Sequence, residues 1–145
     1  STKDLISKLL AAGYVVVAPD YEGLGTPGIH PFLNVKSEAF SITDAVVATR
    51  NYLLQRNLLT SKKWVTVGHS QGGHAALGAA QYASRAQLDY KGTVAVAPAS
   101  NLGFILVAGE QSVANATLDK KISMYAQLDT YTGRYEIYMT ILQSL

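Results

Sequence analysis

Three short valine-rich runs set the strongest limit on how this chain can fold. They are Tyr14 to Ala18, Trp64 to Val67 and Thr93 to Ala97, and none of them alternates strictly between apolar and polar residues. Such runs are typical of strands buried on both faces of a parallel sheet. Segments with helical spacing separate them. The sequence therefore predicts an α/β fold with two right-handed β-α-β units, in which strands over 14–18, 64–68 and 93–97 are parallel neighbours.

Three helices are predicted before and between these strands. The first covers Lys3 to Ala12 and ends at a glycine. The second runs from Glu38 to about Arg56, with Ser37 as a candidate N-cap and an acidic residue that suits the first turn. The third runs from Gln71 to about Arg85, and its alanines form a face small enough to approach a sheet closely. The second and third helices would be the crossovers.

The alternation of strand-like and helix-like segments becomes less clear after about Ser100. Residues 118–128 and 134–145 have the spacing of amphipathic helices. We interpret residues 104–145 as a helical cap or lid that follows a partial core over residues 1–103. The alternative is that these are ordinary outer helices of the same core. The tyrosines of this region either line an acyl pocket or pack the helices together, and packing is favoured: Tyr125, Tyr131, Tyr135 and Tyr138.

The composition of the chain limits the classes of protein to which it can belong. With 145 residues, 48% of them hydrophobic and 15% charged, the chain has the size and make-up of one globular domain. The net charge is +2 and the twelve basic residues are scattered, so no nucleic-acid-binding surface is indicated. There is no cysteine, which excludes disulfides and cysteine-bound metals within these residues. No apolar run approaches the length of about 20 residues that a membrane span needs.

One motif carries chemistry: Gly68-His69-Ser70-Gln71-Gly72 fits the pattern G-x-S-x-G. It follows a predicted buried strand and opens a predicted helix, which is the context that the motif requires. Gly68 and Gly72 would remove Cβ atoms that otherwise collide in so sharp a turn. Ser70, with a positive φ, would then be an exposed nucleophile, and the backbone N–H of Gln71 would face a developing oxyanion. The alternative is a glycine-serine turn that only caps the helix.

None of the three histidines is a good candidate for the general base. His69 is next to Ser70 on a strand and points the other way, and His74 lies about a turn along the helix, so structural roles are favoured for both. His30 precedes the serine, whereas this motif is followed in chain order by an acid and then a histidine. No histidine follows His74. The base is therefore expected outside residues 1–145, and the isolated chain is expected to be almost inactive.

A second glycine pattern is rejected. Residues 23–28 read as G-x-G-x-x-G, the fingerprint of dinucleotide binding, but that fingerprint must open a helix. Pro27 and Pro31 would break such a helix. The segment is instead predicted to be a tight loop, turning at Asp20, whose carboxylate is expected to fix the loop rather than to act in catalysis.

With these residues in place, the chain resembles the secretory lipase family of α/β-hydrolases, of the lipase A type. The most specific part of the match is Asp-Tyr-Glu-Gly-Leu-Gly-Thr-Pro at 20–27. That segment ends a longer matching piece that begins at Gly13, and the other matching pieces are His30-Pro31, 37–39, 63–76 and 97–102. The resemblance implies a partial α/β-hydrolase fold and an enzyme, secreted or periplasmic, that cleaves carboxylic esters including acylglycerols.

The same resemblance assigns the nucleophile to Ser70 and one oxyanion donor to the Gln71 backbone, without metal or cofactor. The partner it implies is a small-molecule or lipid ester, with transient contact to a lipid interface. It also places the family's first strands, with the other oxyanion donor, before Ser1, and the catalytic acid and histidine after Leu145. The chain is therefore interpreted as the middle of a longer hydrolase. The competing readings are a peptidase or acetyl-ester hydrolase of this fold, or a catalytically incomplete α/β module that binds a ligand or partner.

Overall fold

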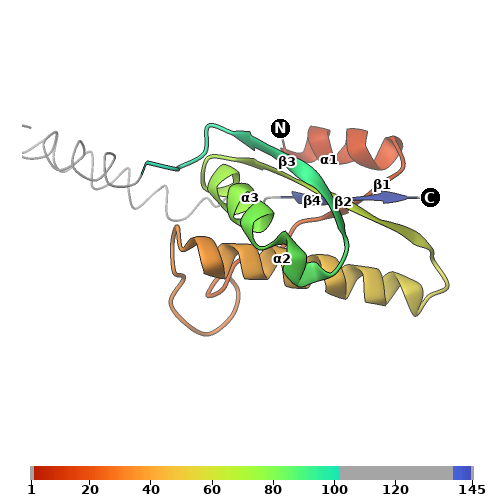
Figure 1. Ribbon diagram of the computed structural model, residues 1–145, viewed down its shortest axis with the longest axis horizontal. Coiled ribbons are helices and arrows are strands. Elements are labelled where there is room, and N and C mark those ends of the chain that lie inside the picture. Colours follow the sequence, from red (N-terminus) through yellow and green to blue (C-terminus); the bar gives the residue numbers. More distant parts are fainter. Residues whose placement is uncertain (1, 102–138, 145) are drawn as a thin grey trace, which may run out of the picture. The chain divides into compact units, whose positions relative to one another are not determined.

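The computed structural model describes residues 2–101 and 139–144, with side chains for 3–101. Helices and strands alternate along most of the described chain (Figure 1). The elements are α1 (Thr2–Ala11), β1 (Tyr14–Val17), α2 (Val35–Leu54), β2 (Thr60–His69), α3 (Gln71–Gln81), the 3-10 helix η1 (Ala83–Ala86), β3 (Asp89–Val96) and β4 (Met139–Ser144). All three valine-rich runs form strands, as predicted.

The sheet has the strand order β1-β4-β2-β3. β2 and β3 are parallel, with Thr66 opposite Thr93, whereas β4 is antiparallel to both β1 and β2. β1 therefore runs in the same direction as β2 but is not bonded to it. The predicted α/β class and the parallel pair are confirmed. The prediction that all three valine-rich strands are direct neighbours is wrong, because β4 lies between the first two.

The C-terminal segment corrects a second prediction. A helix was expected over residues 134–145, but Met139–Ser144 is strand β4. A strand in this position pairs with β1 on one side and β2 on the other, so that the backbone groups of both strands find partners. Tertiary pairing thus overrides the helical spacing of the segment. The rest of the predicted cap, with its four tyrosines, lies outside the described residues, and the boundary at 103/104 stays a prediction.

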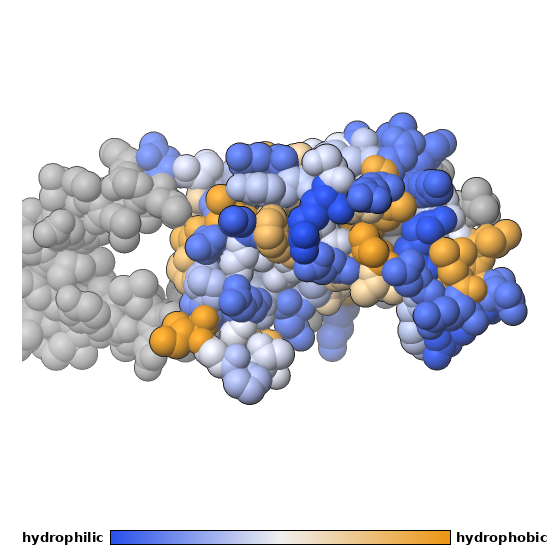
Figure 2. Space-filling model, turned by 60° about the horizontal axis from the view of Figure 1, so that its bottom comes forward, coloured by the Kyte–Doolittle hydropathy of each residue, from blue (hydrophilic) through white to orange (hydrophobic). Residues whose placement is uncertain are grey.

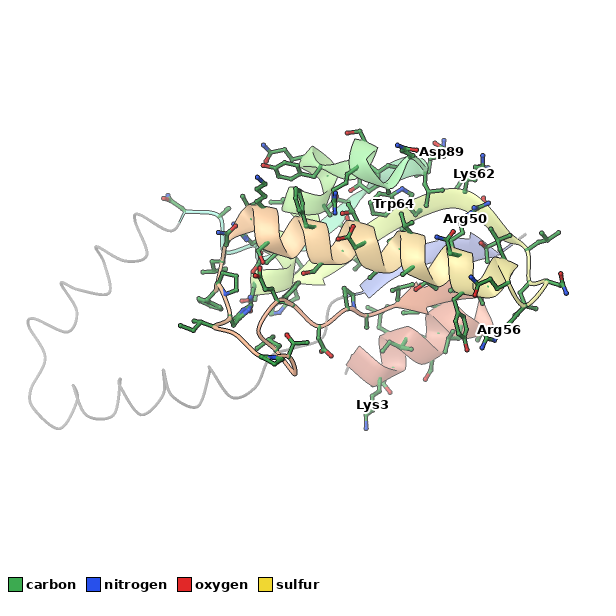
Figure 3. The ribbon with its side chains drawn as sticks, turned by 90° about the horizontal axis from the view of Figure 1, so that it is seen from below. Lys3, Arg50, Arg56, Lys62, Trp64 and Asp89 are labelled. Atoms are coloured by element: carbon green, nitrogen blue, oxygen red, sulfur yellow. The ribbon has the colours of Figure 1, made fainter. Side chains whose placement is uncertain are left out.

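The helices cover the sheet in layers. α2 and α3 lie on one face, and α1 lies on the opposite side next to β1 (Figure 1). The core forms between the sheet and the α2–α3 layer, where Trp64 of β2 is only 1% exposed and lies beside α2 (Figure 3). Ala75 and Ala79 of α3 are fully buried against it, which confirms the small-residue face of that helix. The outward side of this layer is mainly hydrophilic, with separate hydrophobic areas (Figure 2).

The helix ends differ from the predicted ones for local reasons. α2 begins at Val35 because the Asn34 side chain caps it, with Oδ1 accepting from the backbone N–H groups of Lys36 and Ser37 at 3.2 and 3.1 Å. Ser37 is therefore not the N-cap, and its hydroxyl donates instead to Glu22. α3 ends at Gln81 rather than near Arg85, and the chain tightens into η1.

Candidate active site

Ser70 occupies the turn between β2 and α3 with a backbone that few residues adopt. Its φ is 57° and its ψ is −118°, so the predicted positive φ is confirmed. A non-glycine residue in this region costs about 1–3 kcal/mol, which the surrounding structure must supply. Ser70 is the N-cap of α3, yet its side chain makes no capping hydrogen bond, and the residue is exposed. A serine that served only as a cap would use its hydroxyl there, so the capping alternative loses its main support.

Close packing explains the glycine at the start of the motif. A Cβ on Gly68 would overlap the carbonyl group of Gly72 and would lie 2.8 Å from the N atom of Gly73. A Cβ on Gly73 would lie 2.9 Å from the Cα of Pro98. Side chains at these two positions would push the first turn of α3 away from the ends of β2 and β3. The steric argument made from the sequence therefore holds at Gly68.

Backbone hydrogen bonds hold Ser70 in its strained conformation. Its N–H donates to the carbonyl of Val96 at the end of β3, at 3.0 Å. Its carbonyl accepts from the N–H of His74 at 3.1 Å and from the N–H of Ala99 at 3.2 Å. The turn is thus attached to α3 and to the segment after β3. Gln71 is the first residue of α3, where backbone N–H groups have no partner within the helix.

A buried polar cluster lies behind the turn, centred on Glu38 of α2. Glu38 is 0% exposed, and its Oε1 accepts from Gln71 Nε2 at 2.8 Å while its Oε2 accepts from His74 Nδ1 at 2.7 Å. Leaving a buried carboxyl group without a hydrogen-bond partner typically costs about 1–3 kcal/mol, and more if it is charged. The cluster therefore fastens the first turn of α3, which follows Ser70 directly, to the first turn of α2.

The cluster extends into the loop that was rejected as a nucleotide-binding motif. His30 Nδ1 is 2.8 Å from the Glu22 carbonyl oxygen, and its Nε2 is 3.2 Å from Gln71 Nε2. A carbonyl only accepts, so Nδ1 carries the proton, and Nε2 then accepts from the Gln71 amide. The ring also stacks on Tyr21 at 5.9 Å between centroids. His30 is held by partners other than Ser70.

The structure also places the other residues that the sequence analysis considered. The segment 23–28 opens no helix, as predicted, since the next helix begins at Val35. Asp20 is exposed. His74 is hydrogen-bonded to Glu38, which is consistent with a structural role. His69 is the last residue of β2 and is exposed.

Sequence reasoning missed that His30 and Glu38 meet at Gln71. One signal was present, because Glu38 falls on the same helical face as the buried Ile42 and Val46. An acidic residue on an apolar face calls for a buried partner.

Among the residues that the structure describes, no helix is long and apolar enough to cross a bilayer. Within the same residues, no group of three or more histidine, cysteine or acidic side chains is arranged to hold a metal ion.

A strained serine between a parallel strand and a helix, with a helix N-terminus beside it, is the arrangement of the nucleophile in α/β-hydrolases. Comparison with known proteins agrees with this class. The model of the family described as secretory lipase matches residues 2–130. The chain therefore belongs to the secretory lipase family, which supports a lipase-type hydrolase in general terms. No curated protein and no solved structure matches the chain significantly.

Proposed function

We propose that this chain carries the nucleophile of a serine hydrolase that cleaves carboxylic esters of lipids, with acylglycerols as the substrate class. The observation that carries the proposal is Ser70 itself, which is exposed and strained at φ 57° and whose side chain makes no capping hydrogen bond. Strain of this kind persists where the surrounding structure imposes it, and it is concentrated at functional sites. Membership of the secretory lipase family selects lipid esters as the substrate and favours an exported protein.

The mechanism is a two-step acyl transfer. Ser70 Oγ attacks the ester carbonyl carbon, a general base removes the hydroxyl proton and passes it to the departing alcohol, and an acyl-serine remains. Water then attacks the acyl-serine and releases the acid. In both steps the oxyanion is stabilised by the backbone N–H of Gln71, where the N-terminus of α3 adds positive potential. This chemistry requires no metal or cofactor.

The base and its acid partner are proposed to be residues outside 1–145. The engagement of His30 and His74 supports this. Both His30 nitrogens face other partners, and the Nδ1 of His74 donates to Glu38. Rotating either ring toward Ser70 would leave the buried carboxylate or the Gln71 amide without a partner, which is costly.

Kinetics of the intact protein test the proposal. Glyceryl and p-nitrophenyl esters should be hydrolysed, and Ser70→Ala should lower kcat/KM at least about 1,000-fold, because the nucleophile is lost. Ser84→Ala is the matched control, since Ser84 is an exposed serine of η1 and should leave the rate unchanged. Cleavage of peptides alone would indicate a peptidase of the same fold. An intact protein without any hydrolytic activity would indicate a binding module.

A further inference from the structure

Glu38 is placed so that it controls the residues on the C-terminal side of Ser70. Its two carboxylate oxygens are bonded to the first and fourth residues of α3, Gln71 at 2.8 Å and His74 at 2.7 Å. The carboxylate is fully buried, so its hydrogen bonds are not weakened by competition with water. One acidic side chain of α2 therefore holds the whole first turn of α3.

The orientation of Gln71 matters more than that of its neighbours. Under the proposed mechanism its backbone N–H must lie about 2.7–3.1 Å from the position of the oxyanion. Its side chain is held at the amide nitrogen by two acceptors, Glu38 Oε1 and His30 Nε2. Fixing the side chain at its far end restricts rotation of the residue that carries the donor.

The donor and the acceptor of each hydrogen bond from the Gln71 amide are fixed. The Glu22 carbonyl requires a proton on His30 Nδ1, so His30 Nε2 accepts from Gln71 and the second Gln71 N–H is directed at Glu38. The amide of Gln71 therefore cannot flip without facing His30 with an acceptor. His74 is the residue of the cluster that can adapt to a changed partner, because its ring can carry the proton on Nε2 instead of Nδ1.

We propose that Glu38 is a positioning residue for the reaction at Ser70, an inference that rests on the proposed function of that serine. Glu38 does not touch the substrate. It acts through the Gln71 side chain and His74, and it keeps the oxyanion donor aimed at the position of the developing charge.

The test separates positioning from simple stabilisation. In the intact protein, kcat is measured per serine that a fluorophosphonate titrates, so that unfolded molecules do not count. Glu38→Ala should lower kcat about 10- to 100-fold while KM changes little, because a displacement of about 1 Å can cost on the order of 100-fold in rate. Glu38→Gln should recover most of the rate, since its amide oxygen still accepts from Gln71 and His74 adapts its tautomer.

The matched control is Asp44→Asn, an exposed carboxylate of the same helix that pairs with Arg85. Its kcat should stay within about twofold of the parent, as surface ion pairs contribute little. If Glu38→Ala does not fold, Gln71→Met decides the question, because it keeps the side-chain length and removes both hydrogen bonds of the amide. A fall of about tenfold or more in kcat per titrated serine supports positioning.

The contrary result is equally specific. The proposal is overturned if Gln71→Met, or a folded Glu38→Ala protein, has the same kcat per titrated serine as the parent protein. This holds even if the variant has a lower melting temperature. Failure of the proposed function looks different. In that case Ser70→Ala keeps its esterase activity and the fluorophosphonate does not react with Ser70.

Discussion

Two carboxylates of α2 contact the segment that follows Ser70, and the two contacts differ above all in burial. At the nucleophile end, the Glu38 carboxylate is fully buried and bonded to Gln71 and His74. Further along, the Asp44 carboxylate accepts from Arg85 Nη2 at 2.7 and 2.9 Å, but the two side chains are 65% and 41% exposed. The exposed pair is worth about 0–1 kcal/mol, whereas a buried group that loses its hydrogen-bond partner costs about 1–3 kcal/mol, and more if it is charged. Burial is what makes a carboxylate able to fix the geometry of its partners.

The largest effect is expected from Gly68→Ala, which disturbs the turn at Ser70 through a steric clash alone. The new Cβ would overlap the Gly72 carbonyl, so the first turn of α3 must move away from β2. We expect kcat to fall at least about 100-fold and the melting temperature to drop. Gly25→Ala is the control, because nothing lies within 4 Å of its Cβ position and only the cost of its positive φ, about 1–2 kcal/mol, applies. A soluble Gly68→Ala protein with parent kcat would show that the turn tolerates displacement.

An intermediate effect is expected at Thr66, which joins the sheet to the middle of α3. Its buried hydroxyl lies 3.3 Å from the Ala76 carbonyl and 2.9 Å from Thr93 Oγ1. Thr66→Val keeps the shape and removes the hydroxyl, so the free energy of unfolding should fall by about 1–2 kcal/mol. Denaturant titration measures it. Activity per folded molecule should be retained, since Thr93 still donates to Ala76. A loss of kcat without a loss of stability would extend the positioning role beyond the Glu38 cluster.

The smallest effect is expected at the exposed contact. Asp44→Ala removes the pair with Arg85, whose guanidinium also lies over the Phe40 ring at 4.2 Å. Because that cation–π contact remains, we expect a loss of no more than about 1 kcal/mol, and less at high salt. Thermal unfolding at two salt concentrations measures it. A loss of about 3 kcal/mol or more would contradict the distinction drawn between the two contacts.

The sequence predicted the parts of the structure that depend on local pattern. The valine-rich runs, the alanine face of α3 and the strained serine depend on neighbours within a few residues, and all three are present. The place of β4 between β1 and β2 depends on a segment far away in the chain, and local spacing carries no information on such a pairing. The same holds within the site. His30 and Gln71 are 41 residues apart in the sequence, so their contact depends on the tertiary fold and not on a local pattern.

Covalent labelling of the intact protein would identify its nucleophile. A fluorophosphonate reacts with a serine only where the hydroxyl is activated and the oxyanion is stabilised. We expect about one label to be incorporated per active molecule, peptide mass mapping to place that label on Ser70, and the Ser70→Ala protein to take up none. Labelling of a different residue, or ester hydrolysis that proceeds while Ser70 remains unmodified, would contradict this expectation.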